Sequence, residues 1–239
     1  MSSSEPRDNP GSTPSFWRAA GPIMLRGVLY IALVALLMVP VMEDAKQPGI
    51  VGFTEESYTE VLESLLLAFC AAIMLLARRY APSLATCNLL LFGFFFASLI
   101  REQDALFDLF IADGGWQVGV TLTLIPVLFF AFRERHRLPG ELVQLRQSFA
   151  FGLLLAGVLT TYVFARLYGR RIFWEAVMGD GYLRWVKDAA EEVTELFGYL
   201  LLAIAAVELL LLAVQLGRRT EQPTDATLGD SPNSAVRTR

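Results

Sequence analysis

The chain has very few of the residues on which most metal and redox centres depend. Its 239 residues contain one histidine, His136, and two cysteines, Cys70 and Cys87. A zinc centre, a haem held by a pair of histidines and a di-iron bundle with Glu-x-x-His pairs all need more histidine or cysteine than this. Both cysteines lie in apolar stretches, so we expect two small buried residues and neither a disulfide nor a redox pair.

The common catalytic and nucleotide-binding motifs are also absent. The sequence has no Gly-rich phosphate loop, no Gly-x-Ser-x-Gly and no His-Glu-x-x-His. It indicates no organic cofactor, and an enzyme built from it would have to work with carboxylates, tyrosine and arginine. The net charge of −4 argues against a nucleic-acid partner, because such proteins usually carry a clustered basic surface.

Charge is scarce along most of the chain. Charged residues make up 18% of the sequence, against roughly 25% in a soluble domain. Six apolar stretches have about the length that a membrane-spanning helix needs. Strands exposed to lipid would leave backbone groups unpaired, so helices are expected. We predict an all-α, polytopic membrane bundle within residues 16–219, with spans at 22–42, 61–77, 84–100, 115–132, 148–165 and 193–217.

The positions of lysine and arginine predict the orientation of this bundle. One set of connections is short and Arg-rich, and alternate connections are acidic. Because short basic loops stay in the cytoplasm, we expect both termini there and a bacterial inner membrane as the location. The polar segments 1–15 and 220–239 are expected to be disordered cytoplasmic tails. The bilayer is then the first partner of the chain, and a protein partner or a second copy is the next.

Most of the acidic residues gather in the outer connections, where short amphipathic helices are expected. Thr54 to Ser57 is typical of a helix start, with acids near the positive end of the helix. Residues 182–195 are expected to continue directly into the sixth span. The middle connection places Arg101, Asp104 and Asp108 on one turn, with apolar residues that can lie on the membrane surface.

Two pairs of glutamates stand at the membrane boundary on the second and sixth spans: Glu60 with Glu63, three residues apart, and Glu191 with Glu195, four residues apart. Oxygen ligands suit a hard divalent cation, which here would be calcium, magnesium or manganese. The alternative is a solvated helix face whose counter-charges are Arg101, Arg166, Arg170, Arg184 and Lys187.

Glu208 lies deep in the sixth span. An acid inside a membrane is a functional-site hypothesis by default, because its burial is costly. One interpretation is a proton or cation relay. A second is an ion pair with Arg26 or a contact with Asn88. A third is a neutral acid that is hydrogen-bonded to a threonine of a neighbouring span, where the candidates are Thr121, Thr123 and Thr160.

Three arginines near the end of the fifth span, which are Arg166, Arg170 and Arg171, can bind a lipid head group or an anionic substrate. Charge pairs with the acidic connections are the alternative.

Three functions follow from these patterns. The leading hypothesis is a small transporter or channel-like protein for a cation or cationic solute, with carboxylates lining its outer mouth. The second is an accessory or assembly subunit that docks a partner through the acidic loops. The third is a membrane enzyme that acts on lipid with carboxylates or a metal.

Overall fold

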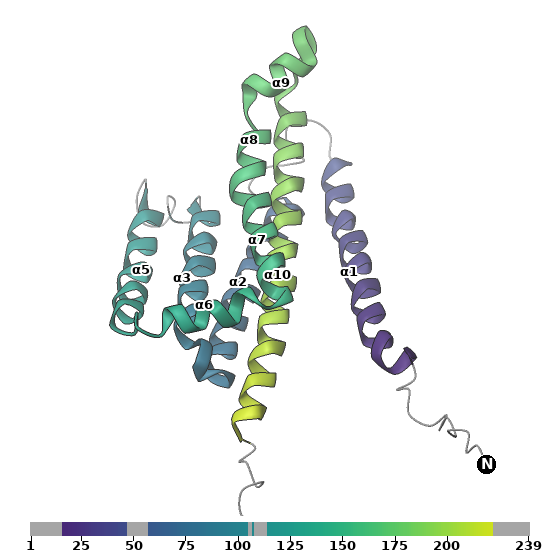
Figure 1. Ribbon diagram of the computed structural model, residues 1–239. Helices are drawn as coiled ribbons and strands as arrows, with labels where there is room; N and C mark the ends of the chain where they lie inside the picture. The colour runs from purple at the N-terminus through teal and green to yellow at the C-terminus, as the bar shows by residue number, and fades with distance from the viewer. Residues whose placement is uncertain (1–15, 47–56, 105–106, 108–113, 222–239) are drawn as a thin grey trace, which may run out of the picture.

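The computed structural model describes residues 16–46, 57–104, 107 and 114–221, and all regular elements in that part of the chain are helical (Figure 1). The long helices are α1 (Phe16–Ala45), α2 (Tyr58–Tyr80), α3 (Ala85–Glu102), α5 (Gly115–Arg133), α7 (Phe149–Val158) and α10 (Arg184–Glu221). Shorter elements are η2 (Pro82–Leu84), α6 (Leu138–Arg146), the π-helical η3 (Leu159–Ala165), α8 (Arg166–Tyr168), α9 (Arg171–Met178) and η4 (Gly179–Gly181). The all-α prediction is confirmed.

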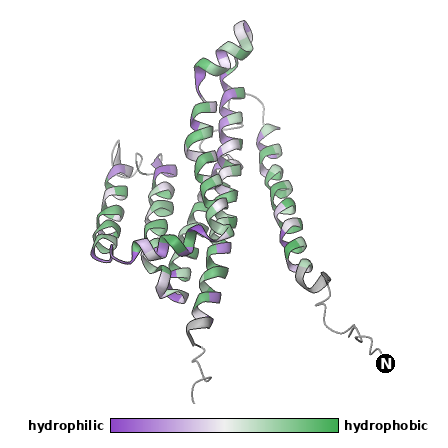
Figure 2. Cartoon of the chain, in the orientation of Figure 1, coloured by the Kyte–Doolittle hydropathy of each residue, from purple (hydrophilic) through white to green (hydrophobic). Residues whose placement is uncertain are grey.

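Six helices are long and apolar enough to cross a membrane, as predicted. They are Ala20–Ala45, Tyr58–Tyr80, Pro82–Glu102, Gly115–Arg133, Phe149–Tyr168 and Arg184–Arg218. The predicted spans fall within these limits, except that residue 148 precedes the fifth helix as its cap. Apolar residues dominate the middle of the helices, and hydrophilic residues gather at their ends (Figure 2). The start of α1 and the end of α10 lie at the same end of the bundle (Figure 1).

Helix α10 is the central helix of the bundle. It packs on α2 and on the helix formed by α7 and η3, while α2 packs on α3 and α3 packs on α5. The buried core between α2, α3 and α10 includes Leu67, Met74, Phe95, Leu202 and Leu209. Cys70 and Cys87 are buried free thiols, as expected from their apolar surroundings.

The contact between η3 and α10 depends on glycine. A Cβ atom added at Gly198 would lie 3.0 Å from the backbone nitrogen of Thr161 and closer still to its Oγ1 atom. One turn away, a Cβ atom at Gly157 would lie 2.7 Å from Cγ of Leu202. Small residues at such positions let two helix backbones approach closely. This approach holds the π-helical segment against α10, next to the polar end of the bundle.

Asp44, at the end of α1, caps the start of α2. Its buried carboxylate accepts hydrogen bonds from the backbone nitrogens of Tyr58 at 3.0 Å and Thr59 at 2.8 Å. Ser57 accepts a third from the nitrogen of Glu60 at 3.1 Å. The predicted start at 54–56 lies outside the described residues, and the described helix begins at Tyr58 with Ser57 as its cap. A carboxylate suits this position because the first backbone N–H groups of a helix lack partners within the helix.

Glu141 of α6 caps α3 at the opposite end of the bundle. Its buried carboxylate accepts hydrogen bonds from the backbone nitrogen of Thr86 at 3.2 Å and that of Cys87 at 2.6 Å. Because 54 residues separate Glu141 from Cys87, this cap joins a connecting helix to a span and does not merely end its own helix.

We expect Glu141→Ala to destabilise the fold, because it leaves two buried N–H groups without an acceptor, at a cost of about 1–3 kcal/mol. Glu141→Gln keeps one acceptor oxygen and should lose about half as much. The measurement is the thermal unfolding midpoint of the purified protein in detergent. Glu175→Ala is the control, since the Glu175 side chain is 41% exposed and pairs with Arg171 four residues earlier. Equal losses in Glu141→Ala and in the control would contradict the capping role.

A short amphipathic helix lies in the connection that precedes α10. Within the part of the chain that is described, it is α9, in which Arg171 and Glu175 form an ion pair and Ile172, Phe173 and Val177 are exposed. Residues 108–113 of the middle connection lie outside the described residues. The predicted helix over 182–195 is confirmed from Arg184 onward, where α10 runs without a break into the sixth span, while Tyr182 and Leu183 precede the helix.

Candidate functional site

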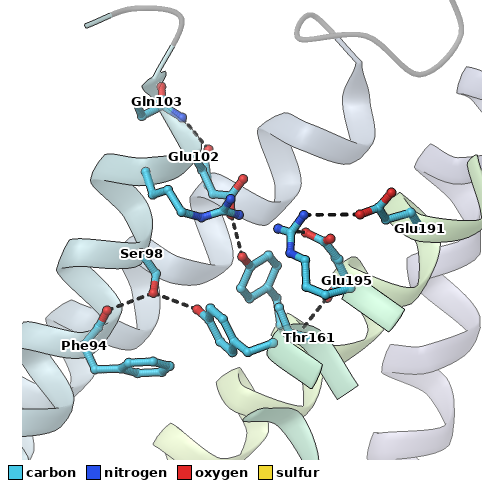
Figure 3. A network of polar contacts seen from close by, with 12 residues as sticks. Phe94, Ser98, Glu102, Gln103, Thr161, Glu191 and Glu195 are labelled. Atoms are coloured by element: carbon cyan, nitrogen blue, oxygen red, sulfur yellow. Dashed lines mark hydrogen bonds and ion pairs between the residues drawn. The ribbon is translucent and has the colours of Figure 1, made fainter. Parts of the chain in front are cut away.

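Four helical segments bring their polar residues together at the end of the bundle that holds the C-terminus of α3, which we call the acidic end. Glu63 comes from α2, Glu102 from α3, Arg166 from the start of α8, and Glu192 and Glu195 from α10. Figure 3 shows Glu102 on one side of this cluster and Glu191 and Glu195 on the other, with tyrosine and arginine side chains between them. Carboxylates from spans far apart in the sequence therefore meet in one place.

Glu63 is the most deeply buried acid of this cluster, with 1% of its surface exposed. Its Oε1 atom has no hydrogen-bond partner. The carboxylates of Glu192, Glu102 and Glu195 all lie within electrostatic range of it. A buried carboxyl oxygen without a partner is costly, so its persistence needs a reason other than stability.

Arg166 holds two acids of α10. Its guanidinium group donates to Glu191 at 3.2 Å and to Glu195 at 3.0 Å (Figure 3). Lys187 adds a second bond to Glu191 at 2.7 Å. Even so, Oε1 of Glu195 is buried and unpaired, with 4% of the residue exposed. The ion pairs thus leave one oxygen of Glu195, as well as one of Glu63, without a partner.

Two tyrosines extend the polar network into the bundle. The Tyr199 hydroxyl donates to Glu102 at 2.6 Å, and Glu102 also pairs with Arg101. The Tyr162 hydroxyl donates to Ser98 at 2.7 Å, and Ser98 donates to the carbonyl of Phe94 at 2.9 Å. The two tyrosine rings meet edge to face, 6.3 Å between centroids. Tyr162 lies in the π-helical η3, and such segments frequently occur at functional sites.

The predicted metal ligands, which are Glu60, Glu63, Glu191 and Glu195, lie on α2 and α10 at the acidic end. Among the described residues, no three or more His, Cys, Asp or Glu side chains are placed so that they could hold a metal ion. Glu191 and Glu195 instead share Arg166. A divalent-cation site at these four residues stays a prediction.

Glu208 lies apart from the acidic end, thirteen residues beyond Glu195 and so roughly 20 Å along α10. Its Oε2 atom accepts from Arg26 at 3.2 Å, and its Oε1 atom accepts from the hydroxyl of Tyr30. The structure therefore shows the geometry of the ion-pair alternative. Both carboxyl oxygens have partners, and these fix α1 to α10.

The three arginines predicted to contact lipid or an anion do not share one partner. Arg166 binds acids of α10, as described above. Arg171 pairs with Glu175 at 2.7 Å and lies 5.9 Å from the ring centre of Tyr182. Arg170 is exposed at the position before α9. For Arg166 and Arg171, the structure shows charge pairs with neighbouring acids.

Several residues of the site were not identified from the sequence. Tyr30 follows Arg26 by four residues and so shares its helix face, which is a signal that the sequence does contain. Tyr162 and Tyr199 are hydroxyl groups within apolar spans, and buried tyrosine usually finds a hydrogen-bond partner. Which partner each tyrosine finds depends on how the helices are arranged, and no spacing within one helix predicts that.

No family model, no curated protein and no solved structure matches this chain. The interpretation of the site therefore rests on its residues and their geometry.

Proposed function

We propose that the chain is a multi-pass protein of a bacterial inner membrane that binds and transports a cation or a cationic solute at Glu63 and Glu195. The six apolar helices are compatible with an integral membrane protein. The basic residues at the ends of α2, α5 and α10, together with those around α6, favour a cytoplasmic location for that end and for both termini. The acidic end then faces outward.

The observation that carries the proposal is the pair of unpartnered, buried carboxyl oxygens on Glu63 and Glu195. Acids this deep in a bundle are normally fully paired. A bound proton or a singly charged cation would give these oxygens the partner they lack. Arg101 pairs with Glu102, and Arg166 binds Glu191 and the other oxygen of Glu195, so neither arginine supplies a partner to these two atoms.

Glu63→Gln should lower transport at least tenfold, because the amide keeps the shape of the side chain but cannot take up a proton or pair with a cation. Its unfolding midpoint should stay the same or rise, since a neutral group no longer faces three carboxylates. Glu195→Gln should lose transport as well. The assay uses the full chain in proteoliposomes, with pyranine to report protons and with sodium, potassium and methylammonium as further probes.

Glu43→Gln is the matched control for this experiment. Glu43 is an exposed acid at the same end, paired with Lys46 at 2.6 Å, and its loss should leave transport unchanged. Transport by Glu63→Gln at the rate of the unaltered protein, with any of the four probes, would rule out a role for this acid. If the unaltered protein transports none of the four probes, the result would favour the second candidate function, which is described next.

The second candidate is an accessory subunit, and α1 is the observation that favours it. Only 6% of the apolar window of α1 is buried within the chain, against 61% for that of α10. A photo-reactive amino acid at Ile31, which is exposed, would report what covers this face in cells. A discrete cross-linked protein would support a subunit role, and lipid alone would not.

The membrane-enzyme alternative gains no support from the groove beside α3 and α5. The large groove beside α3 and α5 has no carboxylate in its lining.

A further inference from the structure

A long groove lies between α3, α5 and the fifth span, and its volume is about 460 Å³. It exists because α5 packs on α3 at the edge of the bundle (Figure 1). The two helices come close where Gly93 faces Val127, since a Cβ atom at Gly93 would lie 2.7 Å from a methyl group of Val127. This arrangement leaves space between α5 and η3.

The groove is polar at one end and apolar along its length. Arg101, Trp116 and Arg166 line it at the acidic end. Deeper positions are lined by apolar side chains such as Leu90, Phe94, Val120, Leu124 and Leu128. Leu90 and Arg101 lie eleven residues apart on α3, so the apolar part extends roughly 16 Å from the arginines. Such a shape and polarity match an amphiphile with its head at the acidic end.

The two arginines favour an anionic head group. Arg101 donates to Glu102 through its NH2 group, and Arg166 donates to Glu191 and Glu195 through NH1 and NH2. A guanidinium group has five N–H donors, so each arginine keeps donors beyond those used. Their side chains are 37% and 43% exposed. The fork of a guanidinium matches phosphate oxygens, and tryptophan is typical of the interface where lipid head groups lie.

We infer that this groove, which we call the α3–α5 groove, binds one anionic phospholipid of the outer leaflet, with its phosphate at Arg101 and Arg166 and an acyl chain along α3 and α5. The inference rests on the proposed membrane location and is independent of cation transport. It takes Arg166 from the predicted lipid contacts and adds Arg101. Neither Arg170 nor Arg171 lines the groove.

The test is native mass spectrometry of the full chain in mild detergent, with phosphatidylglycerol and phosphatidylcholine that carry the same acyl chains. We expect one retained phosphatidylglycerol, bound about tenfold more tightly than phosphatidylcholine, as suits charge-assisted bonds to one phosphate group. Equal retention of the two lipids would mean annular lipid only and would overturn the inference.

Four variants assign the binding to the groove. Arg101→Gln and Arg166→Gln should each reduce the preference for phosphatidylglycerol to less than about threefold. Because these changes also remove ion pairs, Arg101→Lys and Arg166→Lys serve as second variants. They keep the charge and should give an intermediate preference, since lysine lacks the fork. If the lysine and glutamine variants all keep the full preference, the arginines do not bind the head group.

Two further controls separate the parts of the site. Ala97→Trp fills the groove and should reduce retention of both lipids, whereas Arg171→Gln removes an arginine outside the lining and should change nothing. An equal loss in Arg171→Gln would indicate a general effect of charge and would contradict the inference. Glycerol 3-phosphate should not displace the lipid. Displacement by this soluble head group would show that the site binds the anionic group without an acyl chain.

Discussion

Replacing Arg26 by leucine should destabilise the bundle, because it removes the charged partner of Glu208. The change leaves Glu208, which is 7% exposed, with the hydroxyl of Tyr30 as its partner. Breaking a buried ion pair on one side costs about 3–5 kcal/mol. We expect the lower end, about 3 kcal/mol, because the Arg26 side chain is itself 46% exposed. The unfolding midpoint should fall by roughly 6–12 °C for a chain of this size.

The double variant Arg26→Leu with Glu208→Leu tests whether the pair is structural. It removes both charges, and an apolar replacement of a buried pair is often neutral or better, so most of the lost stability should return. Transport should be retained in this double variant, since both oxygens of Glu208 are already engaged. Restored stability with abolished transport would instead identify Glu208 as a relay residue and would contradict the structural role.

Gly198→Ala should destabilise the bundle where η3 packs on α10. The added methyl group meets the backbone nitrogen of Thr161 at 3.0 Å, and no rotamer change can relieve a clash with backbone. Overpacking of this kind costs about 1–3 kcal/mol. The unfolding midpoint should therefore fall by roughly 2–12 °C. Transport should fall as well, because Thr161 donates to the carbonyl of Glu195 and would have to move.

Gly152→Ala is the matched control, and its effect should have the opposite sign. Gly152 also lies inside a helix, but nothing lies within 4 Å of an added Cβ atom there. Alanine in a helix is then favoured over glycine by about 0.5–1 kcal/mol. An unfolding midpoint that changes in the same direction in both variants would show that the contact between η3 and α10 does not depend on this glycine.

The six helices could be predicted from the sequence because the signal for each helix lies within its own segment. Apolar length and flanking charge are properties of one segment, and they placed the spans to within a few residues. The predicted 61–77, which contains Glu63, is shorter than the observed Tyr58–Tyr80 because Glu60 precedes the apolar run and Arg78 and Arg79 follow it. Burial against neighbouring helices tolerates those acids, and a hydropathy pattern does not register such burial.

For the candidate site, the acidic residues could be predicted from the sequence, but their partners could not. Glu63, Glu195 and Glu208 were identified because an acid at or within an apolar span is conspicuous. Their partners come from other helices: Tyr30 binds Glu208, Arg166 binds Glu195, and Tyr199 binds Glu102. Each pairing depends on which helices are neighbours and on their rotation, and α10 has several candidate neighbours. A single sequence contains no information on that choice.

The bond between Arg26 and Glu208 joins two residues that are synthesised at different times. These residues are 182 positions apart, so the first helix is made long before its partner in the last. At about 5–20 residues per second, the ribosome needs roughly 10–40 s to bridge that interval. During this time Arg26 has no Glu208 with which to pair. The bond that joins α1 to α10 can therefore form only after the last long helix has been made.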